Sequence, residues 1–286
     1  MTVEGIIIIV LERSLMMEKR LLTPKEIAQA TIDAGVAKTK LSIMQMIILG
    51  IFAGVFIGFG GQGAITIGQT YANIDVGMSK FIFAAAFPVG LMLVVICGAE
   101  LFTGNNLMIL GCLNGNYKLK DVLRNWVVVY IANFVGSVIL ALLVANSGLM
   151  TGAAAEKAIG IANAKVAIPF GAAVIRGILC NMLVVLAVWM ATGGRDIISK
   201  IFACWFPIML FVLIGFEHSV ANMYFAPLGM YLGAPITWGQ IWLNNLIPVT
   251  IGNIIGGAII VPFAYYNVYV KAPKTPATVE KSAKIA

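Results

Sequence analysis

His218 is the only histidine in the 286-residue sequence, and it lies inside a long apolar stretch. An ionisable group in such a stretch is costly to bury and usually serves a function. Because an imidazole gains or loses a proton near neutral pH, we expect His218 to give a proton, or a hydrogen bond, to an anion that is the conjugate base of a weak acid. The alternative is a buried histidine whose hydrogen bonds only stabilise the fold.

Glu100 and Glu217 occur in the same local pattern. Each glutamate follows a glycine by two positions and precedes an asparagine by five, Asn105 and Asn222 respectively. The shared pattern predicts a common structural task, such as capping free N–H groups where a helix is interrupted, rather than a pair of catalytic carboxylates. We also expect Glu217 to orient the neighbouring His218.

Other residue patterns with a known chemistry are missing from the sequence. The four cysteines lie in apolar stretches and form no C-x-x-C pair, so we expect neither a disulfide framework nor a zinc site. Fingerprints of metalloproteases, serine hydrolases, P-loop proteins and dinucleotide-binding proteins do not occur. With one histidine and no cluster of metal ligands, the chain is predicted not to be an enzyme and to bind no cofactor or metal.

The composition places these polar residues in a membrane. Hydrophobic residues make up 60% of the chain and charged residues only 11%, and the mean hydropathy is +0.97. A soluble domain carries about 25% charged residues, so the lipid bilayer must be the solvent of this chain. The net charge of +7 is assigned to flanking loops. The sequence has no basic patch interleaved with aromatic residues, so nothing in it indicates nucleic-acid binding.

Apolar segments long enough to cross a bilayer need about 20 residues as a helix. We place six of them at residues 43–68, 81–112, 122–144, 168–191, 201–231 and 242–269. The second and fifth are longer than a straight crossing helix requires, and each has polar residues near its middle, around Glu100 and Glu217. Interrupted helices would explain both features, so an all-α membrane protein with two broken spans is expected.

Lysine and arginine predict the orientation, because cytoplasmic loops carry an excess of both. One side of the predicted spans has most of them: Arg13, Lys19, Arg20, Lys25, Lys38, Lys40, Lys118, Lys120, Arg124, Arg195, Lys200, Lys271, Lys274, Lys281 and Lys284. The other side has only Lys80, Lys157 and Lys165. Both termini are therefore predicted to be cytoplasmic, in a multi-pass protein of the inner membrane. A capping box starting at Thr23 predicts an amphipathic helix on the membrane surface before the first span.

The two halves of the sequence resemble each other. Residues 83–88 match residues 202–207, and Asn125, Asn133 and Gly136 recur with identical spacing as Asn245, Asn253 and Gly256. Because each repeat (about 43–146 and 168–269) has three spans, the second must lie inverted, an arrangement typical of channels and transporters with a site near the midplane. After both breaks, the resumed helices would point their N-termini at the membrane centre, which favours an anion there.

Four segments resemble the motifs of a known family. Cys97-Gly-Ala-Glu-Leu-Phe-Thr-Gly104, Gly177-Ile-Leu-Cys-Asn-Met-Leu-Val-Val-Leu-Ala-Val-Trp-Met190, Gly215-Phe-Glu-His-Ser-Val-Ala-Asn-Met223 and Pro248-Val-Thr-Ile-Gly-Asn-Ile-Ile-Gly-Gly257 are similar to those of the formate/nitrite transporter family. The resemblance extends over residues 23–269. It implies a homopentamer with an aquaporin-like protomer, one pore in each protomer, and passage of formate, nitrite, hydrosulfide or similar small anions. The chain would then comprise a cytoplasmic segment (1–42), a channel domain (43–269) and a cytoplasmic tail (270–286).

The same resemblance implies a set of pore residues. The family's central histidine and loop threonine correspond to His218 and Thr103, its vestibule lysine to Lys165, and its pore-lining asparagines to Asn181 and Asn253. Apolar constrictions would be formed by Phe87, Leu91, Val184 and Phe211, and on the loop by Leu101 and Phe102. Arg176 departs from the family pattern, which has an apolar residue there. It either snorkels or pairs at a subunit interface, or it lines the outer half of the pore.

Two other transport functions fit much of this pattern. A proton-coupled anion carrier would use the same residues as a channel, and the sequence does not separate the two. A water or glycerol channel shares the six spans and facing half-helices. However, the Asn-Pro-Ala pair of such channels is missing, and His218 argues for a substrate that exchanges protons. Nor do the residues distinguish formate from nitrite or hydrosulfide.

Overall fold

The computed structural model describes residues 21–271, and within this range the secondary structure is helical apart from one isolated bridge between Leu21 and Gly194. The expected N-terminal cytoplasmic segment up to residue 20 and the tail beyond residue 271 lie outside the described residues. A helix occurs where the capping box predicts one, α2 (Pro24–Thr39), and Thr23 and Glu26 form that box. Its position on a membrane surface stays a prediction.

Six helical segments of the described part are long and apolar enough to cross a membrane, as predicted. They are α3 (Ile43–Gly68), α4 with α5 (Val76–Ala86, Val89–Cys97), α8 (Leu119–Ala145), α10 (Phe170–Gly193), α11 (Ile197–Ile214) and a last run from Trp238 to Val270. That run comprises α13 (Trp238–Gln240), η3 (Ile241–Leu246), α14 (Ile247–Ile254), η4 (Ile255–Ile260), α15 (Val261–Tyr265) and η5 (Tyr266–Val270). A short helix η1 (Tyr71–Asn73) and the surface helix α9 (Gly152–Val166) connect spans.

Both predicted interruptions are present. Helix α5 ends at Gly98 and α11 ends at Gly215, with φ of +80° and +87°, a left-handed conformation that glycine adopts without steric cost. The chain then runs extended and becomes helical again: α6 (Phe102–Asn105), η2 (Asn106–Met108) and α7 (Ile109–Leu113) after the first break, and α12 (Ser219–Tyr231) after the second. The two glycines with the polar residues after them therefore mark the breaks in the sequence.

Close backbone contacts join the helices on either side of the breaks. A methyl group added at Gly54 of α3 would lie 2.1 Å from the carbonyl oxygen of Asn133 in α8. One added at Gly256 would lie 2.1 Å from the carbonyl oxygen of Ile178 in α10. Small residues at such crossings let membrane helices approach within backbone contact. Two tight helix pairs, α3 with α8 and α10 with the last span, thus form the frame that holds the broken segments.

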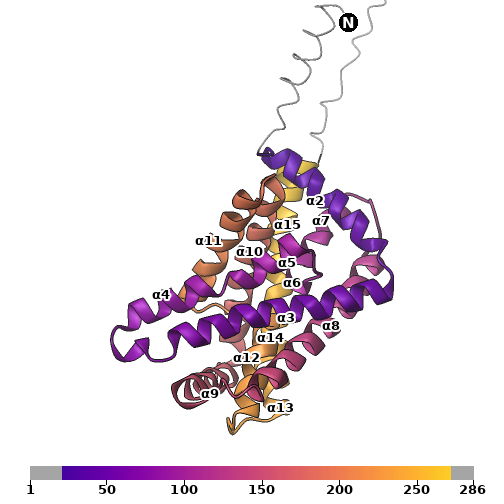
Figure 1. The fold of residues 1–286 in the computed structure, drawn as a ribbon. Helices are drawn as coiled ribbons and strands as arrows, with labels where there is room; N and C mark the ends of the chain where they lie inside the picture. Colours follow the sequence, from indigo (N-terminus) through magenta and orange to yellow (C-terminus); the bar gives the residue numbers. More distant parts are fainter. Residues whose placement is uncertain (1–20, 272–286) are drawn as a thin grey trace, which may run out of the picture.

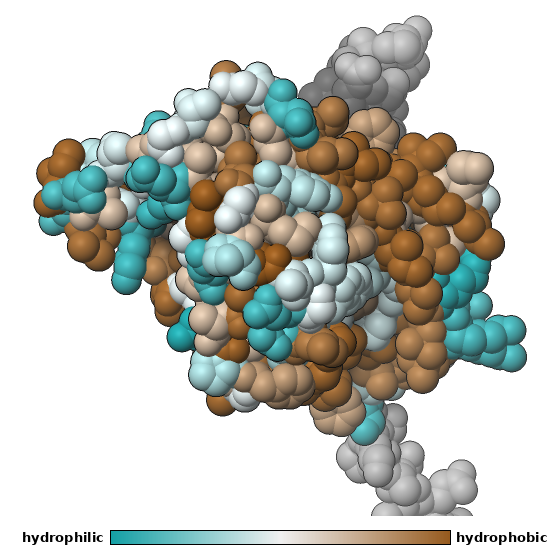
Figure 2. Space-filling model, turned by 90° about the horizontal axis from the view of Figure 1, so that it is seen from below, coloured by the Kyte–Doolittle hydropathy of each residue, from teal (hydrophilic) through white to brown (hydrophobic). Residues whose placement is uncertain are grey.

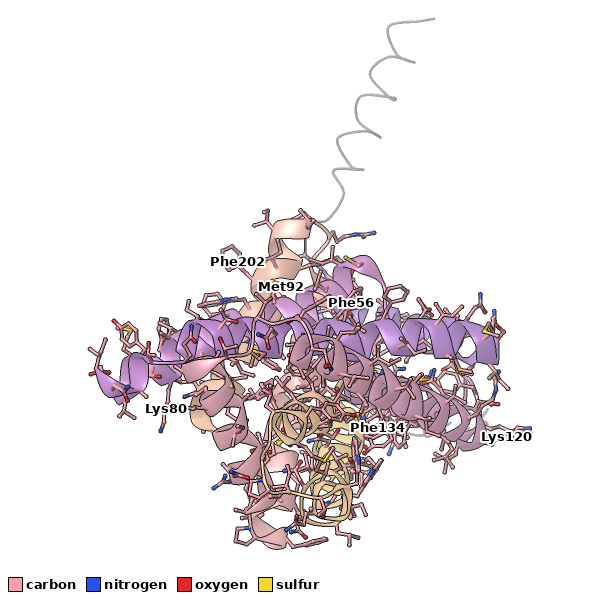
Figure 3. The ribbon with its side chains drawn as sticks, turned by 60° about the horizontal axis from the view of Figure 1, so that its bottom comes forward. Phe56, Lys80, Met92, Lys120, Phe134 and Phe202 are labelled. Atoms are coloured by element: carbon pink, nitrogen blue, oxygen red, sulfur yellow. The ribbon has the colours of Figure 1, made fainter. Side chains whose placement is uncertain are left out.

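The two ends of the bundle carry different elements. In Figure 1, α2 and the start of α11 lie at one end, while α9 and α13 lie at the other. Figure 3 shows Lys80 and Lys120 near opposite ends of the long helix α3, so the connections beside them face opposite sides. Seen from the α9 end (Figure 2), hydrophilic residues gather over the middle of the face, and hydrophobic residues form a broad band to their right, with a hydrophilic group at the right-hand rim. Which end is cytoplasmic stays a prediction.

Candidate functional site

Two cavities enter the bundle toward the two breaks. The α9 cavity, about 420 Å³, is lined by residues that include Lys80, Lys165, Arg176, Glu217 and His218. The α2 cavity, about 450 Å³, is lined by residues that include Lys38, Leu49, Glu100 and Leu101. Each cavity thus contains the carboxylate of one break and a lysine from the surface helix at its own end of the bundle.

A narrow apolar barrier separates the two cavities. A gap of only about 10 Å³ remains there, roughly the space of one water molecule. Its walls are Ile57, Phe87, Leu91, Leu101, Val184, Ile208, Phe211 and His218. The rings of Phe87 and Phe211 meet edge to face with centroids 5.9 Å apart. A gap of this size does not admit a hydrated ion.

Most of the expected constriction residues lie in this barrier, but Phe102 does not. Phe102 is buried outside the cavities and packs edge to face on Trp126 and Tyr130, with centroids 5.9 Å and 4.9 Å away. The loop-side constriction expected from Leu101 and Phe102 therefore has only Leu101 in the barrier. Sequence reasoning missed Ile57 and Ile208. Ile208 precedes Gly215 by the same number of residues as Leu91 precedes Gly98, which is the signal that identifies it.

His218 caps the resumed helix and contacts the threonine of the other break. Its Nδ1 accepts a hydrogen bond from the N–H of Ala221 at 3.1 Å, and its Nε2 lies 2.7 Å from Oγ1 of Thr103. A backbone N–H is always a donor, so Nδ1 is unprotonated and the neutral ring holds its proton on Nε2. The ring therefore donates to Thr103, and the threonine's own hydroxyl hydrogen is left for another acceptor. The sequence-predicted pair is thus brought together.

Glu217 is held by a lysine and an asparagine, not by His218. Lys165 forms an ion pair with Glu217 at 2.8 Å, and Asn222 donates to the second carboxylate oxygen at 2.7 Å. Asn222 also donates to Asn245 at 2.8 Å. No hydrogen bond among the described residues joins Glu217 to the imidazole, whose partners are Ala221 and Thr103. A role of Glu217 in orienting His218 stays a prediction.

Glu100 has the equivalent set of partners in the first half. It forms an ion pair with Lys38 of α2, and Asn105 donates to its second oxygen at 2.7 Å. Asn105 also donates to Asn125 at 2.8 Å. Burying a carboxylate is costly unless it is paired and hydrogen-bonded, and both glutamates meet this requirement in the same way. Lys38 was not predicted as a partner of either carboxylate.

Two asparagines, not the glutamates, cap the resumed helices. Asn133 accepts from the N–H of Phe102 at 2.9 Å and donates to the carbonyl oxygens of Glu100 and Gly50 at 2.9 and 2.8 Å. Asn253 accepts from the N–H of Ser219 at 2.9 Å. It donates to the carbonyl oxygens of Glu217 and Gly177 at 3.0 and 2.8 Å. The carboxylate caps expected from the sequence are therefore replaced by amide caps, which leave the glutamates free to pair with lysines.

Asn181 also bonds to the backbone. Its amide donates to the carbonyl oxygens of Asn253 at 2.8 Å and Thr103 at 3.3 Å, and its side chain is fully buried. Neither Asn181 nor Asn253 belongs to the walls of the two cavities or of the barrier. A pore-lining role for these two asparagines stays a prediction, and their contacts favour a structural one.

The two cavities differ in charge. The walls of the α9 cavity include three basic side chains, Lys80, Lys165 and Arg176, and the carboxylate of Glu217. The walls of the α2 cavity include one of each kind, Lys38 and Glu100. An anion is therefore attracted more strongly to the α9 cavity, because field lines concentrate in a cleft with apolar walls.

Comparisons with known proteins agree with this arrangement. A family model described as formate/nitrite transporter matches residues 25–267. A probable formate transporter of Methanothermobacter thermautotrophicus is 44% identical over 268 residues, covering 87% of this chain and 97% of the relative. The formate channel FocA of Escherichia coli is 35% identical over 272 residues, covering 88% and 95%.

Solved structures match as well. A pentameric formate channel with formate bound superposes with a TM-score of 0.72 at 32% identity, covering 80% of this chain and 98% of that one. An ion channel of the FNT family superposes with a TM-score of 0.79 at 27% identity, covering 85% and 98%. The fold of this chain thus has counterparts among solved channel structures.

Proposed function

The chain belongs to the formate/nitrite transporter family, and from this we propose that it passes small monovalent weak-acid anions, such as formate, nitrite or hydrosulfide, through a pore in each protomer. The observation that carries the proposal is the contact between His218 and Thr103. It puts the only ionisable group of the barrier walls between two cavities that each contain a lysine.

The first step is attraction of the anion into a cavity. Lys165 faces the α9 cavity with a side chain that is 17% exposed, although its ion pair with Glu217 offsets much of its charge. Lys80 adds a basic side chain at the same mouth. Such a field raises the local concentration of an anion and weakens with added salt.

The second step is passage of the barrier. A neutral acid crosses apolar walls with a far smaller desolvation cost than its anion. Neutral His218 holds one proton, on Nε2, and cannot release it to the anion of a weak acid, so in this state it supports the anion only through the hydrogen bond of Thr103. Proton transfer requires the imidazolium form. That form has a hydrogen on Nδ1 and must therefore release the N–H of Ala221.

Membership of the family also suggests an oligomeric state and a membrane orientation for the chain. One structural neighbour is a pentameric formate channel, so we propose a homopentamer in the lipid bilayer of the inner membrane with both termini cytoplasmic. In that setting the α2 cavity opens to the cytoplasm and the α9 cavity to the outside. Inverted repeats would place the two cavities on either side of the midplane.

Uptake into proteoliposomes tests the transport proposal. We would compare formate, nitrite, chloride and glycerol over about pH 5 to 8, the range in which a histidine titrates. Flux of weak-acid anions with glycerol excluded is the expected result, and His218→Ala and Thr103→Ala should change its pH dependence or selectivity without loss of assembly. Glycerol flux without anion flux would overturn the proposal. A fixed ratio of protons to anions against a gradient would favour the proton-coupled carrier over the channel.

A further inference from the structure

We propose that Arg176 makes the α9 cavity a recognition site for bent oxyanions, the class that includes carboxylates such as formate and also nitrite, in preference to anions with a single acceptor atom. The inference rests on the proposed function, because it assumes that such anions enter this cavity. It assigns a specificity role to a residue for which the sequence left a structural role and a pore-lining role open.

The backbone around Arg176 is fixed beside the second break. Its carbonyl oxygen accepts a hydrogen bond from the N–H of Glu217 at 3.3 Å. At the next residue, a methyl group added to Gly177 would lie 2.7 Å from the carbonyl oxygen of Val249, so the helices touch there. The Arg176 side chain projects from this rigid position and contributes to the cavity walls with Lys165 and His218.

The guanidinium has no partner within residues 21–271, whereas the neighbouring lysine has one. Lys165 is paired with Glu217, and the second oxygen of Glu217 accepts from Asn222. No hydrogen bond or ion pair of the described residues engages the Arg176 side chain. An arginine keeps its charge at any physiological pH, so its five N–H donors are available to a ligand in the cavity.

The shape of a guanidinium decides which anions it prefers. Its N–H groups lie in one plane and match the two oxygens of a carboxylate with two parallel hydrogen bonds, and nitrite presents a similar pair of oxygens. A monatomic anion offers one acceptor atom, so it is attracted by the positive charge but lacks the second hydrogen bond. A lysine would supply the positive charge without the planar pair of N–H donors.

The other half of the chain has no guanidinium at the equivalent position. Leu49 is the counterpart of Arg176: its carbonyl oxygen accepts from the N–H of Glu100 at 3.2 Å, and it lies in the wall of the α2 cavity. Recognition by a guanidinium is therefore confined to one side of the barrier. Leu49 also shows that this position accepts an apolar side chain, which makes Arg176→Leu a reasonable substitution.

The test separates the charge of Arg176 from its geometry. Purified parent, Arg176→Lys, Arg176→Leu and the charge control Lys120→Leu would be reconstituted, after size-exclusion chromatography has confirmed the same assembly for each. Lys120 is exposed and lies outside both cavities. The quantities measured are the half-saturation concentrations for formate and nitrite uptake and the chloride concentration that halves formate uptake.

Arg176→Lys should raise the formate and nitrite half-saturation concentrations at least about tenfold, the loss of one charge-assisted hydrogen bond, and leave the chloride value within about twofold. Arg176→Leu should raise both half-saturation concentrations and the chloride concentration that halves formate uptake. Lys120→Leu should change none of the three. The inference is overturned if Arg176→Lys leaves the formate-to-chloride ratio unchanged, or if Arg176→Leu leaves all three values unchanged. A parent protein that passes none of these anions would overturn the proposed function itself.

Discussion

The two halves of the molecule use one scaffold with different side chains at its centre. Around each break, a lysine from a surface helix pairs with a glutamate, and two asparagines extend that pair. A third asparagine caps the resumed helix. The halves differ at the barrier, where Leu101 in one corresponds to His218 in the other, and at the cavity wall, where Leu49 corresponds to Arg176. The shared residues stabilise the two interrupted helices. We propose that the differing residues determine how each half interacts with an anion.

The contact between Tyr130 and Thr250 supports a two-fold relation between the halves. These residues hold equivalent positions, each following an equivalent asparagine, Asn125 or Asn245, by the same interval. Their hydroxyl oxygens lie 2.9 Å apart. Residues that contact their own equivalents must lie at the axis that relates the two units. The inverted arrangement itself stays a prediction, but a two-fold axis between the halves is what it requires.

The largest effect should come from removing the caps that the halves share. Asn133→Ala and Asn253→Ala each leave one buried N–H and two buried carbonyl oxygens without their side-chain partner, at a cost of about 1–3 kcal/mol for each group left unpaired. We expect a loss of roughly 3–9 kcal/mol on this basis, enough to prevent assembly. Thermal unfolding and size-exclusion chromatography in detergent would measure it.

The control for the cap variants is Asn146→Ala, because Asn146 is exposed and donates a single hydrogen bond to its own helix. It should unfold within about 0.5 kcal/mol of the parent. If Asn133→Ala is tolerated while Asn253→Ala is not, the two halves do not share one scaffold and the comparison fails.

A second prediction exchanges the barrier residue of one half for that of the other. His218→Leu copies Leu101 and removes the ionisable group from the barrier walls. Without a hydrogen bond to the Thr103 hydroxyl, anion flux should fall about 100-fold, equivalent to roughly 2.7 kcal/mol, and any dependence on the titration of His218 should vanish. Proteoliposome uptake over pH measures both. Undiminished flux that still responds to pH would place the titrating group elsewhere.

Sequence patterns predicted the parts of the site that depend on local structure. The breaks follow from the excess length of two spans and from the polar residues near the middle of each. Thr103 was named beside His218 by the family resemblance, and their direct contact is seen only in the structure. The constriction residues Phe87, Leu91, Val184 and Phe211 came from the family resemblance. Their places in the barrier match that expectation, although a role in transport stays a prediction.

The remaining contacts depend on geometry that spacing does not encode. Phe102 was assigned to the pore, with Leu101, by the family resemblance, but a chain that resumes its helix turns successive side chains to different faces. Asn133 caps an N–H that belongs to another helix, so its spacing revealed the repeat but not the contact. Lys38 lies on α2, before the first span, and was grouped with the cytoplasmic segment 1–42 although it pairs with Glu100. Equivalent contacts by Lys165 suggest that each repeat begins with its surface helix.

The smallest effect, and the sharpest test of how similar the halves are, compares the two carboxylates. Glu217→Gln and Glu100→Gln keep the shape of the side chain but leave Lys165 or Lys38 without an ion-pair partner. The lysine side chains are 17% and 28% exposed and the glutamates 4% and 7%, so the pair beside the α9 cavity is the more buried. Breaking a buried pair strands a charge, whereas a more exposed lysine regains hydration.

Glu217→Gln should therefore cost about 1–3 kcal/mol of unfolding free energy and Glu100→Gln about half as much, after allowance for the exposure of the lysines. Thermal unfolding in detergent would measure both losses. Part of each loss should be recovered when the unpaired lysine is also replaced, in the double variants Lys165→Met with Glu217→Gln and Lys38→Met with Glu100→Gln. Equal losses in the two halves would mean that the difference in burial has no energetic consequence. A greater loss for Glu100→Gln would mean that the α2 side, not the α9 side, holds the more costly charge pair.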